Sequence, residues 1–270
     1  MRAPRPRAIL AVLGVLLLTA CGTAGATDGA ERATEERVVR VAAAADLKFA
    51  LEEVADLVAE EHPDVRLDLT YGSSGTFVQQ ITNGAPFDLY LSADRGYAEQ
   101  LVDAGLAAPE DLFSYAVGRL VLWTPDGSAL DPAPGLTVLA PEDAGTVAIA
   151  NPEHAPYGRA AVAALRAAGL EEQVRPRLVL GENVAQAAEF VRSGNAQAGV
   201  VALSLVLADP LRGHGRWVEV PVDSYPRLDQ GGVVLSGAAD LGAARAVREV
   251  LLGAGGTEVL ERYGFSLPGS

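Results

Sequence analysis

One strand-helix-strand unit near the start of the chain constrains its fold more than any other feature. The run from Val38 to Ala45, VVRVAAAA, is apolar except for one arginine, which is typical of a strand buried in a parallel sheet. The next segment, DLKFALEEVADLVAEEH, has apolar residues at helical spacing with acidic residues opposite, and Asp46 is its expected N-cap. DVRLDLTY then alternates apolar and polar residues, as a strand does. This order predicts an α/β fold with a parallel sheet and right-handed crossovers.

Further segments continue the alternation of strands and helices to the end of the chain. We expect strands at FDLYLSAD, GRLVLW, GTVAIAN, PRLVLG, AGVVAL, RWVEVP and GGVVLSG. We expect helices over residues 76–82, 158–168, 241–252 and 258–263, and one that begins near residue 184. About 230 residues follow residue 37, which is enough for one large or two modest domains with their own cores.

The N-terminal region has the pattern of an export signal. Three arginines precede the apolar run Ala8 to Ala20, which is too short to span a bilayer as a stable helix. The run ends in Leu-Thr-Ala followed by Cys21, which resembles the lipobox of bacterial lipoproteins, where this cysteine is lipidated and becomes the new N-terminus. We expect a signal peptide over 1–20 and a lipidated flexible tether over 21–37, whose small and charged residues lack apolar periodicity. A plain signal peptide with an incidental cysteine is the alternative.

Charge and cysteine content exclude several classes of protein and site. The single cysteine excludes a disulfide within the chain and a metal site of the multi-cysteine kind. The formal net charge of −14 gives a surface that repels nucleic acid, so we expect no nucleic-acid partner. The same charge repels a small anion at long range. An anionic ligand would therefore have to be held by local donors.

Patterns that indicate catalysis are weak. His62, His154 and His214 are far apart in the sequence, and none has a partner at metal-ligand or triad spacing. The stretch GSSGT does not match the G-x-S-x-G pattern of a nucleophile elbow. An extracellular hydrolase that uses Ser73 or Ser74 remains a remote alternative. We expect no catalytic residue and no enzymatic activity.

Four strand-to-helix junctions offer donors to a ligand. In open α/β sheets ligands bind at the carboxyl ends of strands, where helix N-termini present unpaired N–H groups. The first junction ends in alanines that let a ligand approach the main chain at Ala45. The second, YGSSGT, places Ser73 and Ser74 beside the amides of a helix.

The other two junctions are NPEHAPYGRAA and GENV. In the first, prolines stiffen the loop and Tyr157 can deliver a phenolic hydroxyl. In the second, Asn183 can cap a helix while the main-chain N–H of Val184 points outward. Each junction also has a purely structural interpretation, in which Asp46 or the serines cap helices and Tyr157 packs at a domain edge.

Taken together, these segments resemble the molybdate-binding proteins of ABC importers. The resemblance runs from about Val38 to Phe265 and is carried, in order, by VAAAADLKFALEEVADLVAEE, YGSSGTFVQQITNGAPFDLYLSAD, YAVGRLVLW, IANPEHAPYGRAAVAAL, GENVAQAAEFVRSGNAQAGVVALS and ERYGF. It implies a two-lobed type II periplasmic-binding fold, each lobe a mostly parallel sheet flanked by helices. We expect lobe 1 over 38–115 and 224–270 and lobe 2 over 116–223.

The resemblance also implies a site in which neutral donors alone hold an oxyanion between the lobes. The predicted ligand-binding residues are Ala45, Asp46, Ser73, Ser74, Tyr157 and Val184. Ser74 matches the serine ligand of the second motif, Tyr157 lies at the ligand position of the proline loop, and Val184 matches a main-chain donor. This chain departs from the family at Ala45, where members usually have a hydroxyl, and at Ala202, where many have a ligand tyrosine. We expect the Tyr157 hydroxyl to replace the latter.

The implied function is that of an extracytoplasmic solute-binding lipoprotein. It would capture molybdate or tungstate between its lobes and deliver the anion to the permease of an ABC importer. We expect a monomer, held at the cell membrane by its lipid anchor, with no cofactor and no site for a metal cation. A binding protein for phosphate or sulfate is the alternative. Asp46 bears on this choice, because a carboxylate accepts the proton of hydrogen phosphate but repels molybdate and sulfate, which carry none at neutral pH.

Overall fold

The computed structural model describes residues 36–269. The predicted signal peptide, the lipidation site Cys21 and the predicted tether up to residue 35 lie outside the described residues. Strand β1 begins at Arg37, the last residue assigned to the predicted tether, whose bounds stay a prediction. Within residues 36–269 no helix combines the length and apolar character needed to cross a bilayer.

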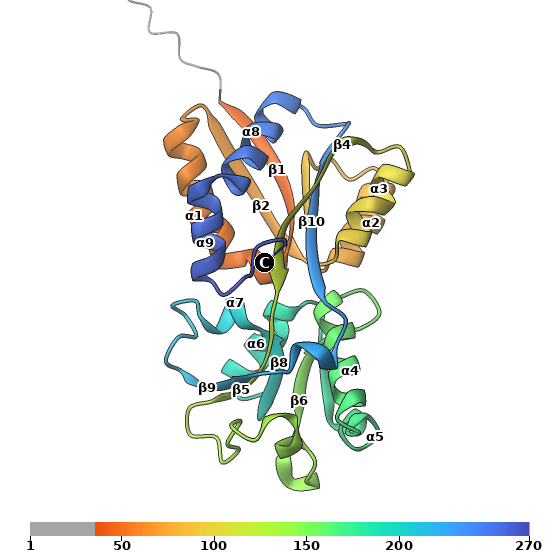
Figure 1. The fold of residues 1–270 in the computed structure, drawn as a ribbon, viewed down its shortest axis with the longest axis vertical. Helices are drawn as coiled ribbons and strands as arrows, with labels where there is room; N and C mark the ends of the chain where they lie inside the picture. The colour runs from red at the N-terminus through yellow and green to blue at the C-terminus, as the bar shows by residue number, and fades with distance from the viewer. Residues whose placement is uncertain (1–35, 270) are drawn as a thin grey trace, which may run out of the picture. The chain divides into compact units, whose positions relative to one another are not determined.

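Two five-stranded sheets form the framework, and both have the same plan (Figure 1). The first has the order β2-β1-β3-β10-β4, and the second has the order β7-β6-β8-β5-β9. In each, the second strand, β1 or β6, pairs in parallel with the two strands that flank it, and the fourth strand, β10 or β5, runs antiparallel to both of its neighbours. Four strands of each sheet therefore point the same way, which confirms the expected two-lobed, mostly parallel α/β fold.

The strands of the first sheet are β1 (Arg37–Ala44), β2 (Val65–Gly72), β3 (Leu89–Ser92), β4 (Ala107–Gly118) and β10 (Leu228–Leu235). Those of the second are β5 (Leu120–Pro125), β6 (Val147–Ala150), β7 (Leu178–Gly181), β8 (Ala198–Ala202) and β9 (Gly215–Glu219). The sequence prediction missed β4, because Pro109, Glu110 and Asp111 interrupt its apolar pattern.

Helices cover both faces of the first sheet. They are α1 (Lys48–Glu61), α2 (Ser74–Thr82), α3 (Arg95–Asp103), α8 (Leu241–Leu252) and α9 (Ala254–Arg262). Helices α1, α8 and α9 pack on one face, and α2 and α3 on the other (Figure 1). Strand β1 is almost continuously apolar because both of its faces are buried. Val41 and Ala43 belong to the cluster under α1, whereas Ala42 belongs to the cluster under α2.

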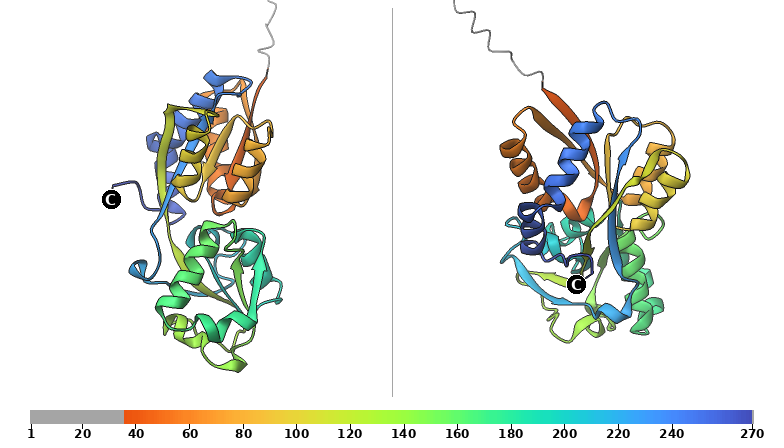
Figure 2. Two further views of the ribbon diagram at one scale, coloured as in Figure 1. Left: turned by 90° about the vertical axis from the view of Figure 1, so that its right-hand side faces the viewer. Right: turned by 45° about the horizontal axis from the view of Figure 1, so that its top comes forward.

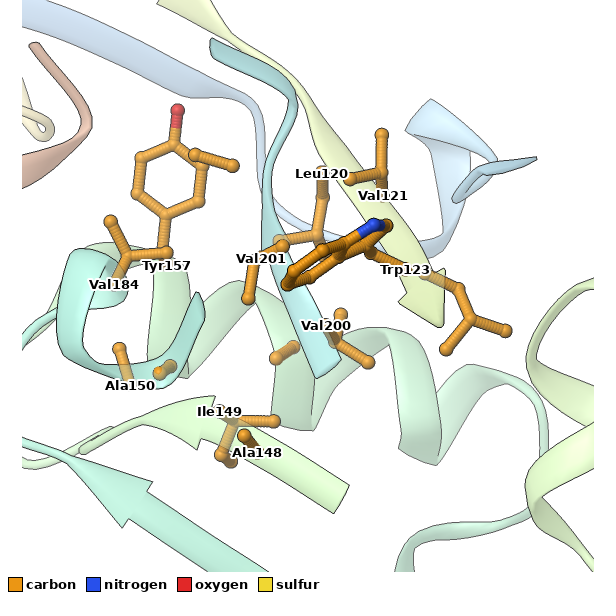
Figure 3. Packing of buried hydrophobic residues seen from close by; sticks show 14 of the residues in the cluster. Leu120, Val121, Trp123, Ala148, Ile149, Ala150, Tyr157, Val184, Val200 and Val201 are labelled. Carbon is orange, nitrogen blue, oxygen red and sulfur yellow. The ribbon is translucent and has the colours of Figure 1, made fainter. Parts of the chain in front are cut away.

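The second lobe is built around one large apolar cluster. Its helices are α4 (Pro156–Ala167), α5 (Glu171–Val174), α6 (Val184–Arg192) and α7 (Leu203–Val206). Figure 3 shows the fully buried Trp123 of β5 packed among residues of β6 and β8. The predicted helices at 158–168 and 184 onward correspond to α4 and α6, whereas α3 and the short α5 and α7 were not predicted.

The chain crosses between the two sheets at two places that lie side by side. It leaves β4 at Gly118 and enters β5 at Leu120, and it returns between the end of β9 and Leu228 at the start of β10 (Figure 2). Leu228 pairs with Gly118 in the first sheet, so the two crossings are adjacent. The lobe boundaries predicted near residues 115 and 224 stay a prediction, since sheet membership alone does not test them.

An ion pair between a buried carboxylate and a partly exposed arginine links segments of the first lobe. The side chain of Asp88 is 1% exposed and accepts hydrogen bonds from the guanidinium of Arg40 and from the main-chain N–H groups of Arg40 and Ala239. Burial alone would raise the pKa of this carboxyl, but the bonds from Arg40 and Ala239 outweigh it and hold the pKa below its usual range. Asp88 thus joins β1 to the turn after β10.

Replacing Asp88 by alanine is expected to lower the free energy of unfolding by about 3 kcal/mol, because it leaves a guanidinium and two N–H groups without their acceptor. Asp64→Ala is the matched control. It removes the partner of Arg37 in a pair whose side chains are about one third exposed, and such pairs contribute little. Denaturant unfolding measures both losses, and equal losses would contradict the structural role of Asp88.

Candidate functional site

All six residues predicted to bind a ligand line one small cavity between the two sheets. Its lining consists of Ala44, Ala45, Asp46, Gly72, Ser73, Ser74, Ala93, Ala155, Pro156, Tyr157, Asn183 and Val184. The cavity measures about 10 Å³, about what one water molecule occupies. The lobes are therefore closed upon each other in this structure. Any larger ligand requires them to move apart.

Three helices of full length begin at this cavity. Ser74 is the first residue of α2, Pro156 is the first of α4 and Val184 is the first of α6. The first N–H groups of a helix have no partner within it and carry partial positive charge, so the three N-termini form an environment that favours an anion. Helix α2 belongs to the first lobe and the other two to the second. An anion in the cavity would thus contact both lobes.

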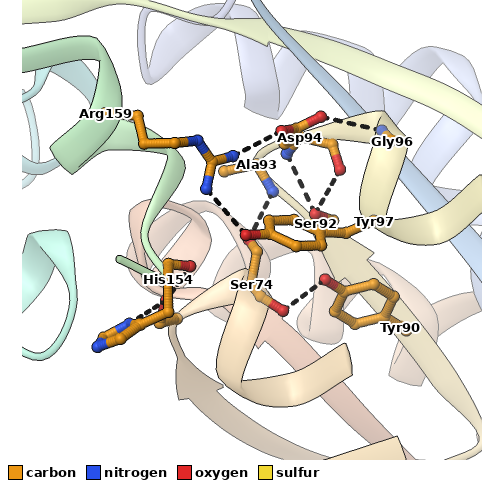
Figure 4. A network of polar contacts seen from close by, with 10 residues as sticks. Ser74, Tyr90, Ser92, Ala93, Asp94, Gly96, Tyr97, His154 and Arg159 are labelled. Carbon is orange, nitrogen blue, oxygen red and sulfur yellow. Dashed lines mark hydrogen bonds and ion pairs between the residues drawn. The ribbon is translucent and has the colours of Figure 1, made fainter. Parts of the chain in front are cut away.

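The environment of Ser74 leaves its hydroxyl proton free for a ligand. Its Oγ accepts a hydrogen bond from the main-chain N–H of Ala93 at 3.0 Å, and its carbonyl accepts one from the Tyr90 hydroxyl at 2.8 Å (Figure 4). Within residues 36–269 no acceptor takes the proton of the Ser74 hydroxyl. The side chain is therefore held in place as an acceptor while its one donor remains available.

The side chain of Ser73 forms its hydrogen bonds with the opposite lobe. It is the N-cap residue of α2 without a capping bond, and its Oγ donates to the carbonyl of His154 at 2.7 Å. The same oxygen lies 2.9 Å from Nδ1 of His154, whose Nε2 is 3.5 Å from a carboxylate oxygen of Glu182. His154 thus has polar partners in space that its spacing in the sequence did not indicate. Loop packing brings together residues that are 81 positions apart.

The Ser73, His154 and Glu182 cluster closes the cleft and is not arranged for nucleophilic attack. The Ser73 hydroxyl directs its proton at the main-chain carbonyl of His154, so the imidazole ring beside it does not receive that proton in this arrangement. The N–H of Gly75 donates to the same carbonyl at 2.9 Å. Arg159 of α4 adds a second link between the lobes through Asp94 at 2.7 Å and Tyr97 at 2.8 Å (Figure 4).

Asp46 does not cap its helix, contrary to the sequence prediction. It lies in the 3₁₀ turn η1 (Ala45–Leu47), and the N-cap residue of α1 is Leu47, which makes no side-chain capping bond. Oδ2 of Asp46 accepts from Nε2 of Gln230 at 2.5 Å, and Oδ1 has no partner within the described residues. The carbonyl of Asp46 accepts from the Ser204 hydroxyl at 2.7 Å. Asp46 is thus a buried carboxyl at the centre of the site.

Burial raises the pKa of Asp46 to about 6. Hydrogen bonds from Gln230 and from the Tyr157 hydroxyl offset part of this effect. Tyr157 is itself buried, and desolvation together with the charge of Asp46 raises its pKa well above the usual value, so it stays a neutral donor. Its ring packs in the core of the second lobe while its hydroxyl leaves that core (Figure 3).

Gln230 is the residue of the site that sequence reasoning missed. It is fully buried in β10, and its Nε2 lies 3.4 Å from the Tyr157 hydroxyl. The only local indication of its role was the position of this polar amide directly before the apolar run GGVVL. No local pattern indicated a contact with Asp46, which lies 184 positions away. Gly118 makes room for this cluster, since a Cβ there would lie 2.3 Å from the Tyr157 hydroxyl oxygen.

The remaining predicted residues take simple positions. Asn183 caps α6, as expected, by accepting from the N–H of Gln186 at 3.0 Å, which leaves the N–H of Val184 at the cavity. Ala45 begins η1 and presents only its main chain. Ala202 ends β8 and does not line the cavity. Within the described residues no group of three or more histidine, cysteine or acidic side chains could hold a metal ion.

Comparison with known proteins identifies the family to which this chain belongs. Residues 39–266 match the sequence pattern of the bacterial extracellular solute-binding proteins. The molybdate-binding protein ModA of Azotobacter vinelandii is 39% identical over 236 residues, which are 87% of this chain and 92% of that protein. ModA of Rhodobacter capsulatus is 40% identical over 195 residues, 72% of this chain and 75% of that one.

The fold has a counterpart among solved structures. The periplasmic molybdate-binding protein of Azotobacter vinelandii superimposes with a TM-score of 0.79 at 30% identity, and the match covers 85% of this chain and 99% of that one. These matches confirm the family resemblance inferred from the sequence and the two-lobed type II fold.

Asp46→Asn is expected to stabilise the ligand-free protein above pH 6. Because the folded state raises the pKa of Asp46 to about 6, stability due to the neutral carboxyl is fully present below about pH 4 and is lost as the pH rises to 6. The variant does not ionise, so its advantage should be small at pH 4 and about 2 kcal/mol at pH 7. Denaturant unfolding at both pH values measures it, and an equal effect at both would show that Asp46 is not a strained carboxylate.

Proposed function

Because this chain belongs to the family of bacterial extracellular solute-binding proteins, we propose that it captures molybdate between its two lobes and delivers it to an ABC importer. Its relatives named molybdate-binding protein are binding proteins, which confirms the expectation that this chain is not an enzyme. The observation that carries the proposal is the meeting of three helix N-termini and the free Ser74 hydroxyl at one cavity.

The donors at the cavity suit a tetrahedral dianion. They are neutral: main-chain N–H groups at Ala45, Asp46 and Val184, and the hydroxyl of Ser74. A buried anion loses its hydrogen bonds to water and requires others in their place. Neutral donors can supply these bonds without an opposite charge. Tungstate has the same shape and charge as molybdate, so the proposal includes it.

Binding would act by hinge closure. The bonds of Ser73 and Gly75 to His154, and of Arg159 to Asp94, form only when the lobes meet. An anion that contacts helix N-termini of both lobes adds to these contacts in the closed state alone, so it shifts the population toward that state. The closed form would then dock on the permease.

The proposed location follows from the N-terminal sequence. The signal-like run before Cys21 and the lipobox support export and attachment to the cell membrane through a lipid at that cysteine. We propose that the folded body works there as a monomer and needs no cofactor. Mass spectrometry of the membrane fraction would identify the lipidated cysteine.

Phosphate or sulfate is the competing ligand. The buried Asp46 carboxyl is the observation that favours phosphate, because hydrogen phosphate would donate its proton to an unpaired oxygen there. Calorimetric titration of the purified protein with molybdate, tungstate, sulfate and phosphate at neutral pH decides the question. Tight binding of the first two alone supports the proposal, and binding of phosphate alone would replace it.

Ser74→Ala is expected to weaken molybdate binding about tenfold, since it removes one neutral donor worth about 1.4 kcal/mol. Ser193→Ala, at an exposed position after α6, is the matched control and should leave the affinity unchanged. Unfolding curves of both variants show whether the loss reflects binding alone. An unchanged affinity in Ser74→Ala would remove this hydroxyl from the site.

A further inference from the structure

Asp46 is the one acidic residue that lines the cavity, and its position conflicts with the capture of a dianion. The side chain is 1% exposed, and its Oδ1 has no hydrogen-bond partner within the described residues. Buried oxygen acceptors normally have a donor. A fully deprotonated oxyanion would bring only further acceptors and a second negative charge to this place.

The surroundings of Asp46 supply no cation to neutralise it. Nearby groups are Gln230 of β10, Tyr157 of α4, Tyr115 of β4 and Ser204 of α7, all of them uncharged. No ion pair of Asp46 exists within residues 36–269, and neighbouring Lys48 makes none with it. If Asp46 were ionised beside a bound dianion, only hydrogen bonds would therefore stabilise the two negative charges.

We propose that Asp46 is protonated when the oxyanion is bound, so that each molybdate captured takes up one proton from solution. The inference rests on the proposed function and specifies how a site that contains a buried carboxyl group can bind a dianion. The proton converts the unpaired oxygen of Asp46 from an acceptor into an O–H donor. It thereby provides, next to Ala45, a hydroxyl donor at the junction where this chain lacks one.

The proton balance sets the pH dependence. Burial raises the pKa of Asp46 to about 6 in the free protein, so the group is largely ionised at pH 7 and 8 and must gain the proton on binding. The affinity should be constant below about pH 6 and fall tenfold for each pH unit above it. A site without this coupling would show a flat profile.

His154 is the alternative acceptor of a proton taken up from solution. Its ring contacts Ser73 and Glu182 across the closing cleft. It is therefore the other side chain on which a proton taken up during closure can reside. Variants at the two positions show which residue takes up the proton.

The experiment is calorimetry of the purified protein with molybdate at pH 8, in two buffers that differ in ionisation enthalpy. The difference in heat gives the number of protons taken up. We expect about one for the unaltered protein and for His154→Gln, and none for Asp46→Asn, whose affinity should also no longer depend on pH. Asp68→Asn, the same change at an exposed position of β2, is the control and should keep the proton uptake.

Difference infrared spectroscopy provides a second test that needs no folded variant. Addition of molybdate at pH 8 should produce the C=O band of a protonated carboxylic acid. Tight molybdate binding with no proton uptake and no such band would overturn the inference and leave the proposed function intact. Uptake that persists in Asp46→Asn but disappears in His154→Gln would also overturn it. Binding of phosphate alone without proton uptake would mean that the ligand itself carries the proton, and no binding of any oxyanion would remove both proposals.

Discussion

The unpaired N–H groups at the start of three helices are the interaction on which the site depends. They meet because the carboxyl ends of parallel strands in both sheets face the same space, and each of these strands is followed by a helix that begins there. Main-chain donors do not require charged side chains. A protein with a net charge of −14 can therefore present a locally favourable environment for an anion without a single arginine or lysine in the lining of the cavity.

Much of the site follows from local sequence. Ser74 and Val184 could be predicted because a strand end, small residues and a helix start occupy a few consecutive positions, and such junctions fall at one edge of a parallel sheet. The resemblance to a known family then assigned the ligand chemistry. The bounds of α8 and the start of α6 were predicted correctly, because they too depend on local sequence.

The polar contacts across the molecule could not be predicted in this way. Asp46 has the local signature of a helix cap, and only the tertiary structure places Gln230 against its carboxyl. His154 likewise meets Ser73 through loop packing that leaves no trace in spacing. Strand β4 escaped detection because its outer half is polar, with Asp111 pairing with two arginines of α8 and not with its own strand neighbours. Long-range pairing of charged groups is the part of a fold that periodicity does not encode.

The adjacency of the two crossings at Gly118 and Leu228 has a mechanical consequence. Two adjacent crossings join the lobes at one place, so the lobes are expected to move relative to each other mainly by rotation about that place. One angle then describes most of the opening of the molecule. Since the Tyr157 hydroxyl and Gln230 meet at Gly118, the contacts of Asp46 lie beside this axis of rotation, where a given rotation moves atoms less than it does farther from the axis.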